Sequence, residues 1–371
     1  MTILLLNYEY PPLGGGAANA TERLLSEYSQ RDDLFVTFVT SSTAKYRMER
    51  PFGNIEIHFL DIGKRGSLHY QSNAELLRYS WRAFWYARRL CRQRRFDVVH
   101  AFFGIPCGVL ARWLGLPFVV SLRGSDVPGY SRRYRVADAL LFRRLSRSVW
   151  RRACAVVANS AGLRDLALQS APEQSIQVTP NGVDTGEFSP GAEPSAAAGL
   201  RILFVGRLIP RKGVADLLAA LRGVTDVALT VVGDGPERDA LALYAANHGI
   251  DATFSGNVEH SALPHLYRAH QLFVLPSYNE GMSNTVLEAM ASGLPVVVTD
   301  VGGSGELVDE NGVVVPVGDV EALRDAIVSF RDDPAGRSAM GVRSREIALR
   351  YSWAAVAQEY VAVYRRCGSD A

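Results

Sequence analysis

The chain has 371 residues, which is too long for one ordinary hydrophobic core and fits two domains. Hydrophobic residues make up 48% and charged residues 21%, values typical of folded globular proteins and not of disordered chains. The four cysteines are far apart and form no C-x-x-C pair, which argues against a disulfide framework and a zinc site. No window reaches the roughly 18 apolar residues of a membrane span, so we expect a cytoplasmic protein without signal peptide or anchor helix.

The two halves of the chain carry opposite charge. Residues 1–180 contain 25 Lys and Arg against 14 Asp and Glu, whereas residues 181–371 contain 15 against 24. The basic half predicts an anionic partner, such as a membrane surface, a phosphorylated lipid or an acidic glycan. A general preference for arginine explains the asymmetry equally well, because the chain has 37 Arg and only 3 Lys.

The first elements are an apolar strand, a glycine loop and a helix, in that order. Thr2 to Asn7 predicts the strand, and the helix is expected from about Ala20 to Gln30. Between them, Gly14, Gly15 and Gly16 allow the backbone to approach phosphate oxygens closely. The dinucleotide fingerprint G-x-G-x-x-G would need glycine where Asn19 stands, which argues against an NAD enzyme.

Apolar runs and helical stretches then alternate through the first half. This alternation predicts a doubly wound parallel α/β sheet, whose ligands gather at the carboxyl ends of its strands. The strands are expected at Phe35 to Thr40, Ile55 to Leu60, Asp97 to Ala101, Pro117 to Leu122 and Ala153 to Ala158.

The helix expected at Glu75 to Arg95 is basic and amphipathic. Trp81 and Trp85 lie near the border of its apolar and arginine faces, where aromatic residues sit in helices that lie on a membrane. The simpler interpretation is an outer helix of the domain with its arginines in water. The sequence leaves both interpretations open.

Polar residues follow two of the predicted strands. His100 lies at the end of one, and Arg123 to Asp126 follow another. Asp126 is placed to accept a proton from an acceptor hydroxyl or to orient it, whereas an arginine such as Arg123 cannot act as a base at neutral pH. The segment Tyr130 to Arg135 fits an acceptor-side loop or a solvated basic turn.

A second series of strands starts after residues 191–199, a stretch rich in Ala, Pro and Ser that predicts a flexible linker. Its first strand, Leu200 to Val205, runs into the loop Gly206 to Gly213. Arg207 and Lys212 in this loop supply two cations that can stabilise a departing diphosphate. The loop is not a P-loop, because it lacks G-x-x-x-x-G-K-[ST].

The remaining elements follow the same alternation. Strands are expected at Leu229 to Val232, in the apolar runs Leu272 to Ser277 and Pro295 to Thr299, and at Val313 to Pro316, and one more strand is expected to end at Phe254 to Val258. Helices are expected at 319–331, 334–350 and Trp353 to Arg366. His260, His265 and His270 are spaced five apart, which suits neither one helix face nor a metal cluster, so we expect them at the surface.

Two glutamates stand eight residues apart across a predicted helix start. Glu280 precedes the helix and Glu288 lies within it, after a first turn that Ser283 or Asn284 can cap. The amides of Gly281 to Thr285 then meet at a positive helix N-terminus that can hold a diphosphate without a metal. Glu288 is placed to accept hydrogen bonds from the vicinal hydroxyls of a ribose. The pattern fits a nucleoside diphosphate that carries a sugar.

Several segments resemble retaining glycosyltransferases of family 4, which have the two-domain GT-B fold. They are the block Pro276 to Thr299 with its two glutamates, the loop Gly206 to Gly213, and the crossover Val178 to Asp184 with its Asn181-Gly182 pair. The first loop, Y-x-Y-P-P-x-G-G-G, is similar to that of the family, so the resemblance covers nearly the whole chain. It departs from the family at Arg123, where the usual motif has a histidine near the reacting centre.

The resemblance implies two Rossmann-like parallel-sheet domains that face a central cleft. Residues 1–180 would form the acceptor-side domain, with the terminal helix 352–371 packing back on it, and residues 181–351 the nucleotide-sugar domain. The residues that it implies in catalysis are Glu280, Arg207, Lys212 and Asp126. Those that it implies in substrate binding are Glu288, Gly281, Met282, Ser283, Asn284, Thr285, Gly14, Gly15, Gly16, Val258, Arg123 and Asn181.

Individual roles follow from the same resemblance. Glu280 would hold hydroxyls of the donor sugar and Glu288 the ribose, while Arg207 and Lys212 neutralise the departing diphosphate. The segment around Val258 would hold the nucleobase through its backbone. Retention would proceed by front-face attack, with the leaving phosphate taking the acceptor proton.

The implied activity is retaining transfer of a sugar from a nucleotide sugar to an acceptor hydroxyl, without a metal or a cofactor. No D-x-D triplet occurs in the chain, which fits metal independence. A UDP-sugar is the favoured donor and GDP-mannose the alternative. The acceptor would be a glycan or glycolipid of bacterial surface polysaccharide synthesis, or a small soluble molecule, and no nucleic-acid partner is expected. A phosphorylase and a non-catalytic nucleotide-sugar-binding protein are the rival classes.

Overall fold

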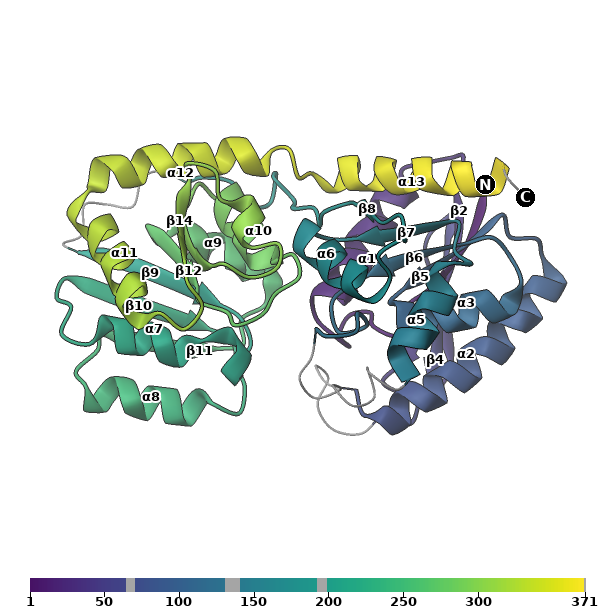
Figure 1. Ribbon diagram of the computed structural model, residues 1–371, viewed down its shortest axis with the longest axis horizontal. Helices are drawn as coiled ribbons and strands as arrows, with labels where there is room; N and C mark the ends of the chain where they lie inside the picture. Colours follow the sequence, from purple (N-terminus) through teal and green to yellow (C-terminus); the bar gives the residue numbers. More distant parts are fainter. Residues whose placement is uncertain (65–70, 131–140, 192–198, 370–371) are drawn as a thin grey trace. The chain divides into compact units, whose positions relative to one another are not determined.

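The computed structural model describes residues 1–64, 71–130, 141–191 and 199–369 (Figure 1). The predictions for Tyr130 to Arg135 and for the linker at 191–199 lie almost wholly outside these residues. The chain divides into two compact units. Unit 1 comprises Met1–Asn181 and Trp353–Ala371, and unit 2 comprises Gly182–Ser352. Each unit has its own parallel sheet and its own hydrophobic core, which confirms the predicted fold class.

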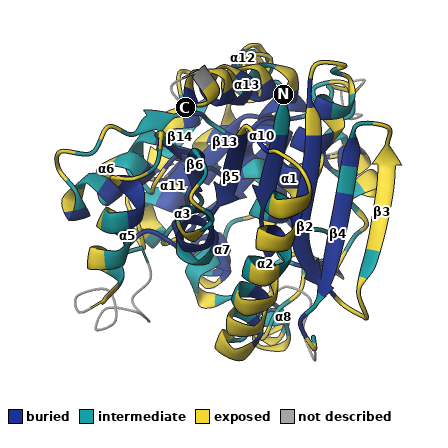
Figure 2. Cartoon of the chain, turned by 90° about the vertical axis from the view of Figure 1, so that its right-hand side faces the viewer, coloured by how far each residue is buried: buried dark blue, intermediate teal, exposed yellow. Residues whose placement is uncertain are grey.

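Unit 1 is built on an eight-stranded sheet in the order β3-β4-β2-β1-β5-β6-β7-β8. Its strands are β1 (Thr2–Leu6), β2 (Phe35–Ser42), β3 (Arg47–Phe52), β4 (Ile55–Asp61), β5 (Val98–Phe102), β6 (Phe118–Leu122), β7 (Ala155–Ala158) and β8 (Gln177–Val178). Neighbouring strands pair in parallel except β3 and β4. Figure 2 shows β2 and β4 buried along most of their length and β3 exposed at the sheet edge.

The helices of unit 1 pack against this sheet and against one another. They are α1 (Gly16–Ser29), α2 (Asn73–Gln93), the π-helical turn η1 (Gly104–Gly108), α3 (Val109–Leu114), α5 (Arg143–Trp150), α6 (Ala161–Ser170) and α13 (Trp353–Ser369). Helix α2 starts at a capping box in which Ser72 and Glu75 exchange hydrogen bonds. It buries Tyr79, Ala83 and Ala87, whose four-residue spacing places them on one face.

Buried polar groups join α13 to the sheet of unit 1. The Nδ1 atom of His100 on β5 lies 2.6 Å from the hydroxyl of Tyr364, and its Nε2 atom lies 2.7 Å from Oγ of Ser121. Ser121 is in turn 3.0 Å from the hydroxyl of Tyr360. Burial, together with the charge of Arg123, holds the pKa of His100 well below its usual range. His100 therefore serves the packing of α13 instead of meeting a ligand at the end of its strand.

Unit 2 has a six-stranded, wholly parallel sheet in the order β11-β10-β9-β12-β13-β14. Its strands are β9 (Leu200–Val205), β10 (Val227–Val232), β11 (Ala252–Gly256), β12 (Leu272–Leu275), β13 (Val296–Thr299) and β14 (Gly312–Val315). Strands β12 and β13 are buried throughout, which is why they appear in the sequence as continuous apolar runs.

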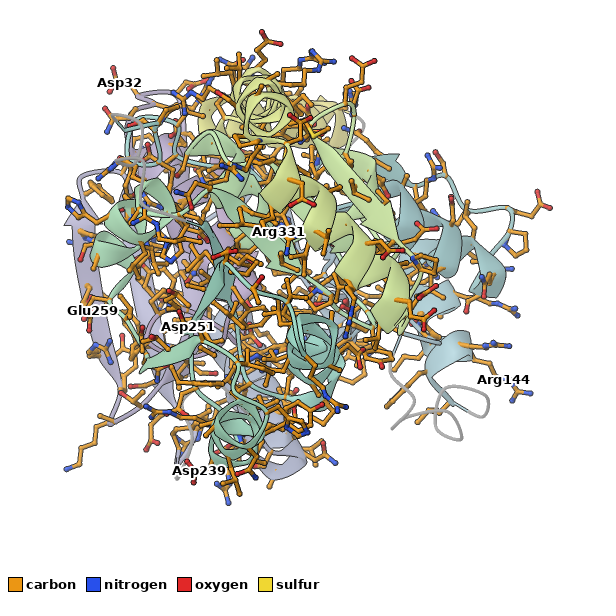
Figure 3. All side chains as sticks on the ribbon, turned by 90° about the vertical axis from the view of Figure 1, so that its left-hand side faces the viewer. Asp32, Arg144, Asp239, Asp251, Glu259 and Arg331 are labelled. Carbon is orange, nitrogen blue, oxygen red and sulfur yellow. The ribbon has the colours of Figure 1, made fainter. Side chains whose placement is uncertain are left out.

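The helices of unit 2 cover its sheet. They are η4 (Pro210–Lys212), α7 (Val214–Leu221), α8 (Arg238–Asn247), η5 (His260–Ala262), α9 (Leu263–Arg268), α10 (Asn284–Ala291), η6 (Gly305–Leu307), α11 (Val320–Asp332) and α12 (Pro334–Ala348). Figure 3 shows acidic side chains at the surface of this unit, among them Asp239, Asp251 and Glu259. Such exposed positions carry part of the negative charge of the second half.

Three expectations from the sequence are corrected. Helix α1 begins at Gly16 and not at Ala20, because its first turn already packs Ala18 into the core. Strand β3 was not expected, since its residues are polar and largely exposed and its only described neighbour is the antiparallel β4. His270 is buried and not at the surface, with its Nε2 atom 2.8 Å from Oγ1 of Thr230.

Candidate active site

The loops that follow β9 and β12 meet at one point of unit 2. The strand order runs outward from β9 through β10 to β11 on one side and from β12 through β13 to β14 on the other. The pair β9–β12 is thus the topological switch point of the sheet, where ligands of doubly wound folds bind beyond the carboxyl ends of the strands. Arg207 and Lys212 follow β9, and Glu280 follows β12.

Lys212 and Glu280 form an ion pair at this point. Nζ of Lys212 donates a hydrogen bond to Oε1 of Glu280, and Oγ of Ser277 donates to the same oxygen over 2.7 Å. The two charged side chains are only 13% and 10% exposed. Burial acts to raise the pKa of Glu280, but the charge and hydrogen bond of Lys212, with the bond from Ser277, outweigh it and hold that pKa below its usual range.

The lowered pKa of Glu280 predicts a pH dependence of stability. A carboxylate whose pKa is lower in the folded chain adds stability above its unfolded value of about 4.3, and this stability is lost as the pH falls through the folded pKa. We expect Glu280→Gln to lower the Tm most at neutral pH and progressively less as the pH falls below about 4. The exposed Glu321→Gln is the control. An effect of Glu280→Gln that does not change between pH 7 and pH 3.5 would contradict the assignment.

Close backbone contacts hold the two loops together. Gly213 has a positive φ of 68°, and a Cβ atom at this position would lie 2.0 Å from the carbonyl oxygen of Pro276. A Cβ at Gly302 would likewise lie 1.8 Å from the carbonyl oxygen of Glu280. The loop after β13 thus packs on the backbone beside Glu280, and the loop after β9 packs on the segment leading to it. Glycine is required at both positions.

Gly213→Ala is therefore expected to damage the site, and Gly223→Ala serves as its matched control. Gly223 has nearly the same φ, 71°, but nothing lies within 4 Å of a Cβ added there. In both variants, an alanine with left-handed backbone angles should lower the free energy of unfolding by about 1–2 kcal/mol. Only Gly213→Ala must also move Pro276, and with it the segment that carries Glu280. We expect Gly213→Ala to lower the Tm clearly more than Gly223→Ala does, as measured by thermal unfolding; equal losses in the two variants would contradict the close contact.

The N-terminus of α10 borders the ion pair. Ser283 is the N-cap residue, but its side chain makes no hydrogen bond to the first-turn amides and instead lies 3.1 Å from Oγ1 of Thr285. The sequence predicted a cap by Ser283 or Asn284; the structure places Ser283 at the N-cap position but shows no side-chain cap there. Gly281, Met282 and Ser283 are buried, whereas Asn284 and Thr285 are partly exposed. A helix start without a side-chain cap leaves an anion as a suitable acceptor for its amides.

Glu288 lies one turn inside α10 and has two side-chain partners that the sequence did not suggest. The hydroxyl of Tyr267 donates to Oε2 over 2.9 Å, and Nε2 of His260 lies 3.3 Å from Oε1. His260 belongs to η5 and Tyr267 to α9, both of which precede β12. Tyr267 is fully buried, whereas His260 is half-buried and also lies 3.7 Å from Oε1 of Glu187.

The other predicted residues of unit 2, Arg207 and Val258, follow the strands β9 and β11. Arg207 is exposed in the loop after β9. The amide of the next residue, Leu208, donates to the carbonyl oxygen of Asp234, which attaches this loop to the turn after β10. Val258 follows β11 and packs partly buried against the core of unit 2.

The glycine loop of unit 1 leads directly into α1. Gly15 and Gly16 are exposed. Gly15 is the N-cap residue of α1, so no side chain at this position caps the first amides of the helix. Gly14 has a φ of 99°. The loop thus presents backbone at the switch point between β1 and β5 of this sheet.

Arg123 and Asn181 hold each other in unit 1. Nη1 of Arg123 donates to Oδ1 of Asn181 over 2.8 Å, and Nη2 donates to the hydroxyl of Tyr360 over 3.2 Å. The guanidinium also lies over the ring of Phe102, 4.3 Å from its centre. These contacts give Arg123 a structural role at the position where the related motif has histidine. Its predicted part in substrate binding remains a prediction.

Asp126 anchors the loop that carries Arg123. Its carboxylate accepts hydrogen bonds from the backbone amides of Arg123, Gly124 and Gly104, at 2.9, 3.0 and 2.6 Å. Burial raises the pKa of Asp126, and these amides oppose that rise. These contacts position the loop of Arg123; the predicted part of Asp126 in catalysis, accepting a proton from an acceptor hydroxyl or orienting it, stays a prediction.

Among the described residues, no group of three or more His, Cys, Asp or Glu side chains is arranged to hold a metal ion.

Comparisons with known proteins identify the family. Residues 14–187 match the model of Glycosyltransferase Family 4, and residues 199–333 match the model of Glycosyl transferases group 1. The glycogen synthase of Mycobacterium tuberculosis is 31% identical over 288 residues, which are 74% of this chain and 69% of that protein. The chain belongs to glycosyltransferase family 4.

Two further similarities describe this family 4 glycosyltransferase. A GDP-mannose-dependent alpha-mannosyltransferase of Mycolicibacterium smegmatis is 31% identical over 289 residues, which are 72% of this chain and 73% of that protein. The structure of a sucrose-phosphate synthase from Thermosynechococcus elongatus aligns over 100% of both chains with a TM-score of 0.84 at 22% identity. The GT-B fold is thereby confirmed.

Proposed function

We propose that this glycosyltransferase moves a sugar from a nucleotide sugar to an acceptor hydroxyl, with retention of configuration and without a metal ion. One observation carries the proposal. A buried pair of opposite charges, Lys212 and Glu280, stands at the switch point of unit 2, beside a helix N-terminus that has Glu288 one turn inside. Cation, amides and two carboxylates suit the diphosphate, the sugar and the ribose of one donor.

Lys212 is assigned to the diphosphate. An ammonium group has three donors, and the structure records one of them on Glu280. The remaining donors, with the amides at the start of α10 and the exposed Arg207, stabilise the negative charge that develops as the glycosidic bond breaks. This stabilisation needs no proton transfer.

Glu280 is assigned to hydroxyls of the donor sugar. Both of its recorded hydrogen bonds, from Lys212 and Ser277, reach Oε1. The carboxylate is thus oriented, and Oε2 is the oxygen that we assign to the sugar. The same logic assigns the ribose hydroxyls to Oε1 of Glu288, where they would replace or share the long contact with His260.

Retention is proposed to proceed by attack from the face of the leaving group. The bond from the acceptor oxygen to the anomeric carbon forms while the bond to the phosphate oxygen breaks, and that phosphate oxygen takes the acceptor proton. The contacts in unit 1 support a step without a protein base. Arg123 is held by Asn181 and Tyr360, and Asp126 is held by three backbone amides.

The donor is proposed to be a UDP-sugar, with GDP-mannose as the alternative, and the acceptor a glycan or glycolipid of bacterial surface polysaccharide synthesis. The test is release of nucleoside diphosphate from UDP-glucose, UDP-N-acetylglucosamine, GDP-mannose and ADP-glucose, with and without EDTA. Thermal shifts with the corresponding nucleotides accompany it, since a ligand at 100 times its Kd adds roughly 2.7 kcal/mol of stability. We expect one nucleotide to stabilise the protein and its sugar to be consumed, both unchanged by EDTA. The absence of any shift and any turnover would overturn the proposal.

A non-catalytic nucleotide-sugar-binding protein is the second candidate. It is favoured by the structural role of Arg123 at the position of the family histidine. A thermal shift with a nucleotide sugar, without turnover on a broad panel of sugar and lipid-linked acceptors, would support this candidate.

A further inference from the structure

The exposed tryptophans of the protein gather at one place in unit 1. Of the five tryptophans, Trp150 and Trp353 are buried, whereas Trp81, Trp85 and Trp113 are 68%, 50% and 59% exposed. Trp81 and Trp85 lie one turn apart on α2 with their ring centres 5.7 Å apart. The three exposed rings therefore belong to one surface and not to scattered positions.

Phe84 connects this surface across two helices. Its ring lies 5.3 Å from that of Trp85 and 5.8 Å from that of Trp113 on α3. Leu77, one turn before Trp81, is 71% exposed. We call Leu77, Trp81, Phe84, Trp85 and Trp113 the tryptophan patch. A contiguous apolar patch of this kind on a protein in water marks an interaction surface.

The helices that carry and adjoin the patch are almost purely basic. Helix α2 contacts α3, and α3 contacts α5 (Figure 1). Their arginines are Arg78, Arg82, Arg88, Arg89, Arg92, Arg112, Arg143, Arg144 and Arg147. Their single acidic residue, Glu75, is buried and paired with Lys64 at 3.1 Å, so it adds no negative charge to the surface. Arg144 on α5 extends away from the protein (Figure 3).

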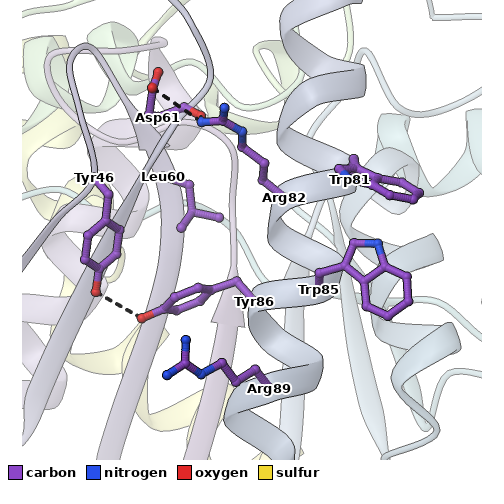
Figure 4. Close-up of a pocket in the computed structure, with 8 residues that line it drawn as sticks. All are labelled: Tyr46, Leu60, Asp61, Trp81, Arg82, Trp85, Tyr86 and Arg89. Carbon is purple, nitrogen blue, oxygen red and sulfur yellow. Dashed lines mark hydrogen bonds and ion pairs between the residues drawn. The ribbon is translucent and has the colours of Figure 1, made fainter.

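A groove runs beside the patch, between α2, the end of β4 and Tyr46, which precedes β3. It has a volume of about 360 Å³. Figure 4 shows Arg82, Tyr86 and Arg89 pointing from α2 into this groove, while Trp81 and Trp85 project from the other side of the helix. Asp61 at the end of β4 pairs with Arg82 at 3.4 Å. Arg89 then brings a positive charge next to the hydroxyls of Tyr86 and Tyr46, which are 3.0 Å apart.

These features fit the surface of an anionic bilayer. Tryptophan side chains partition to the head-group region, where one end of the ring is apolar and the other meets water. Arginines on the same helices can contact lipid phosphates, while their aliphatic stems cover apolar surface. The charge complementarity favours phospholipids over a protein surface, because the three helices that carry and adjoin the patch hold nine arginines and only one, buried, acidic residue. No helix in the described part of the chain is long and apolar enough to cross a membrane.

We propose that the face formed by α2, α3 and α5 docks unit 1 on the surface of a membrane that contains anionic phospholipids. Trp81, Trp85 and Trp113 enter the head-group region, and the arginines of the three helices contact lipid phosphates. The proposal rests on unit 1 alone, so its test does not depend on the donor chemistry assigned to unit 2.

The test is cosedimentation of the full-length protein with sucrose-loaded vesicles of phosphatidylcholine, with or without 30% phosphatidylglycerol. We expect the protein to bind the anionic vesicles. Binding should be at least tenfold weaker with pure phosphatidylcholine vesicles, and at least tenfold weaker in 0.5 M salt. Tryptophan fluorescence should shift to the blue on binding. Trp81→Ala/Trp85→Ala and Arg88→Gln/Arg89→Gln/Arg92→Gln should each weaken binding at least tenfold. Both sets lie at exposed positions, so the Tm should change little.

Matched controls come from exposed positions of unit 2. Leu243→Ala/Val342→Ala removes apolar side chains that are as exposed as the tryptophans, and Arg222→Gln/Arg350→Gln removes exposed charges. These variants should bind vesicles like the wild type. The proposal is overturned if the wild type does not bind anionic vesicles, or if the patch variants bind as well as the controls. A loss of self-association in the patch variants without vesicle binding would instead assign the face to a second copy of the chain. The nucleotide-induced thermal shift, measured on the same variants, reports separately on unit 2.

Discussion

Lys212→Met is expected to lower kcat by about 10²- to 10³-fold, the loss found when one fixed donor to a developing negative charge is removed. The variant removes the cation that we assign to the departing diphosphate. It also leaves Glu280 buried with a negative charge and without Lys212, so the Tm should fall as well. Loss of activity and loss of stability therefore need to be separated.

Two further variants separate them. Lys64 also forms a buried ion pair, with Glu75 in unit 1, and Lys64→Met should reduce stability in a similar way without changing kcat. The double variant Lys212→Met/Glu280→Gln removes both charges of the pair and should regain much of the lost stability while remaining inactive. Initial rates at saturating donor and thermal unfolding give both quantities. A double variant that regains activity together with stability would show that Lys212 only supports the fold.

Glu288→Gln is expected to raise the Kd of the nucleoside diphosphate about 10- to 100-fold, because hydrogen bonds to a charged group contribute roughly 1.5–3 kcal/mol. The sharper prediction concerns the ribose. The wild type should bind the 2′,3′-dideoxy form of its nucleotide much more weakly than it binds the nucleotide itself. The Glu288→Gln variant should bind the dideoxy form and the parent nucleotide almost equally well, because this variant has already lost the contact with the ribose hydroxyls.

Tyr267→Phe provides a graded comparison. It leaves the carboxylate of Glu288 in place but removes its buried donor, so the Kd should rise by less than in Glu288→Gln. Tyr244→Phe, on α8 of the same unit, is the control. Calorimetry with the two nucleotides measures all four proteins. Equal loss of affinity for the parent and dideoxy nucleotides in Glu288→Gln would contradict the contact with the ribose.

The strands of unit 2 were predictable because buried parallel strands leave a clear pattern. The strand predicted at Leu200 to Val205 has the same bounds in the structure, whereas the apolar runs Leu272 to Ser277 and Pro295 to Thr299 form the shorter strands Leu272–Leu275 and Val296–Thr299. Strand β3 gave no such pattern, because Arg47 to Phe52 faces solvent at an edge. Where burial does not select apolar residues, the sequence carries little information about the strand.

Which residues belong to the candidate site was easier to predict than which of them contact one another. Lys212 and Glu280 were both expected in ligand-binding loops, but with separate tasks. Their ion pair depends on β9 and β12 being neighbours, and strand order is not contained in the hydrophobic pattern. Tyr267 and His260 were missed for a related reason. They precede β12 in sequence and reach Glu288 only through the packing of α9 and η5 beside α10.

Amide hydrogen exchange of the full-length protein, with and without the nucleotide that stabilises it, tests the central claim most directly. The claim is that the nucleoside diphosphate binds at the β9–β12 switch point of unit 2. We predict that protection increases in peptides that cover residues 206–213 and 279–288, and that Glu288→Gln reduces this protection at equal nucleotide concentration. Protection confined to other segments, with these two unchanged, would contradict the assignment of the donor site.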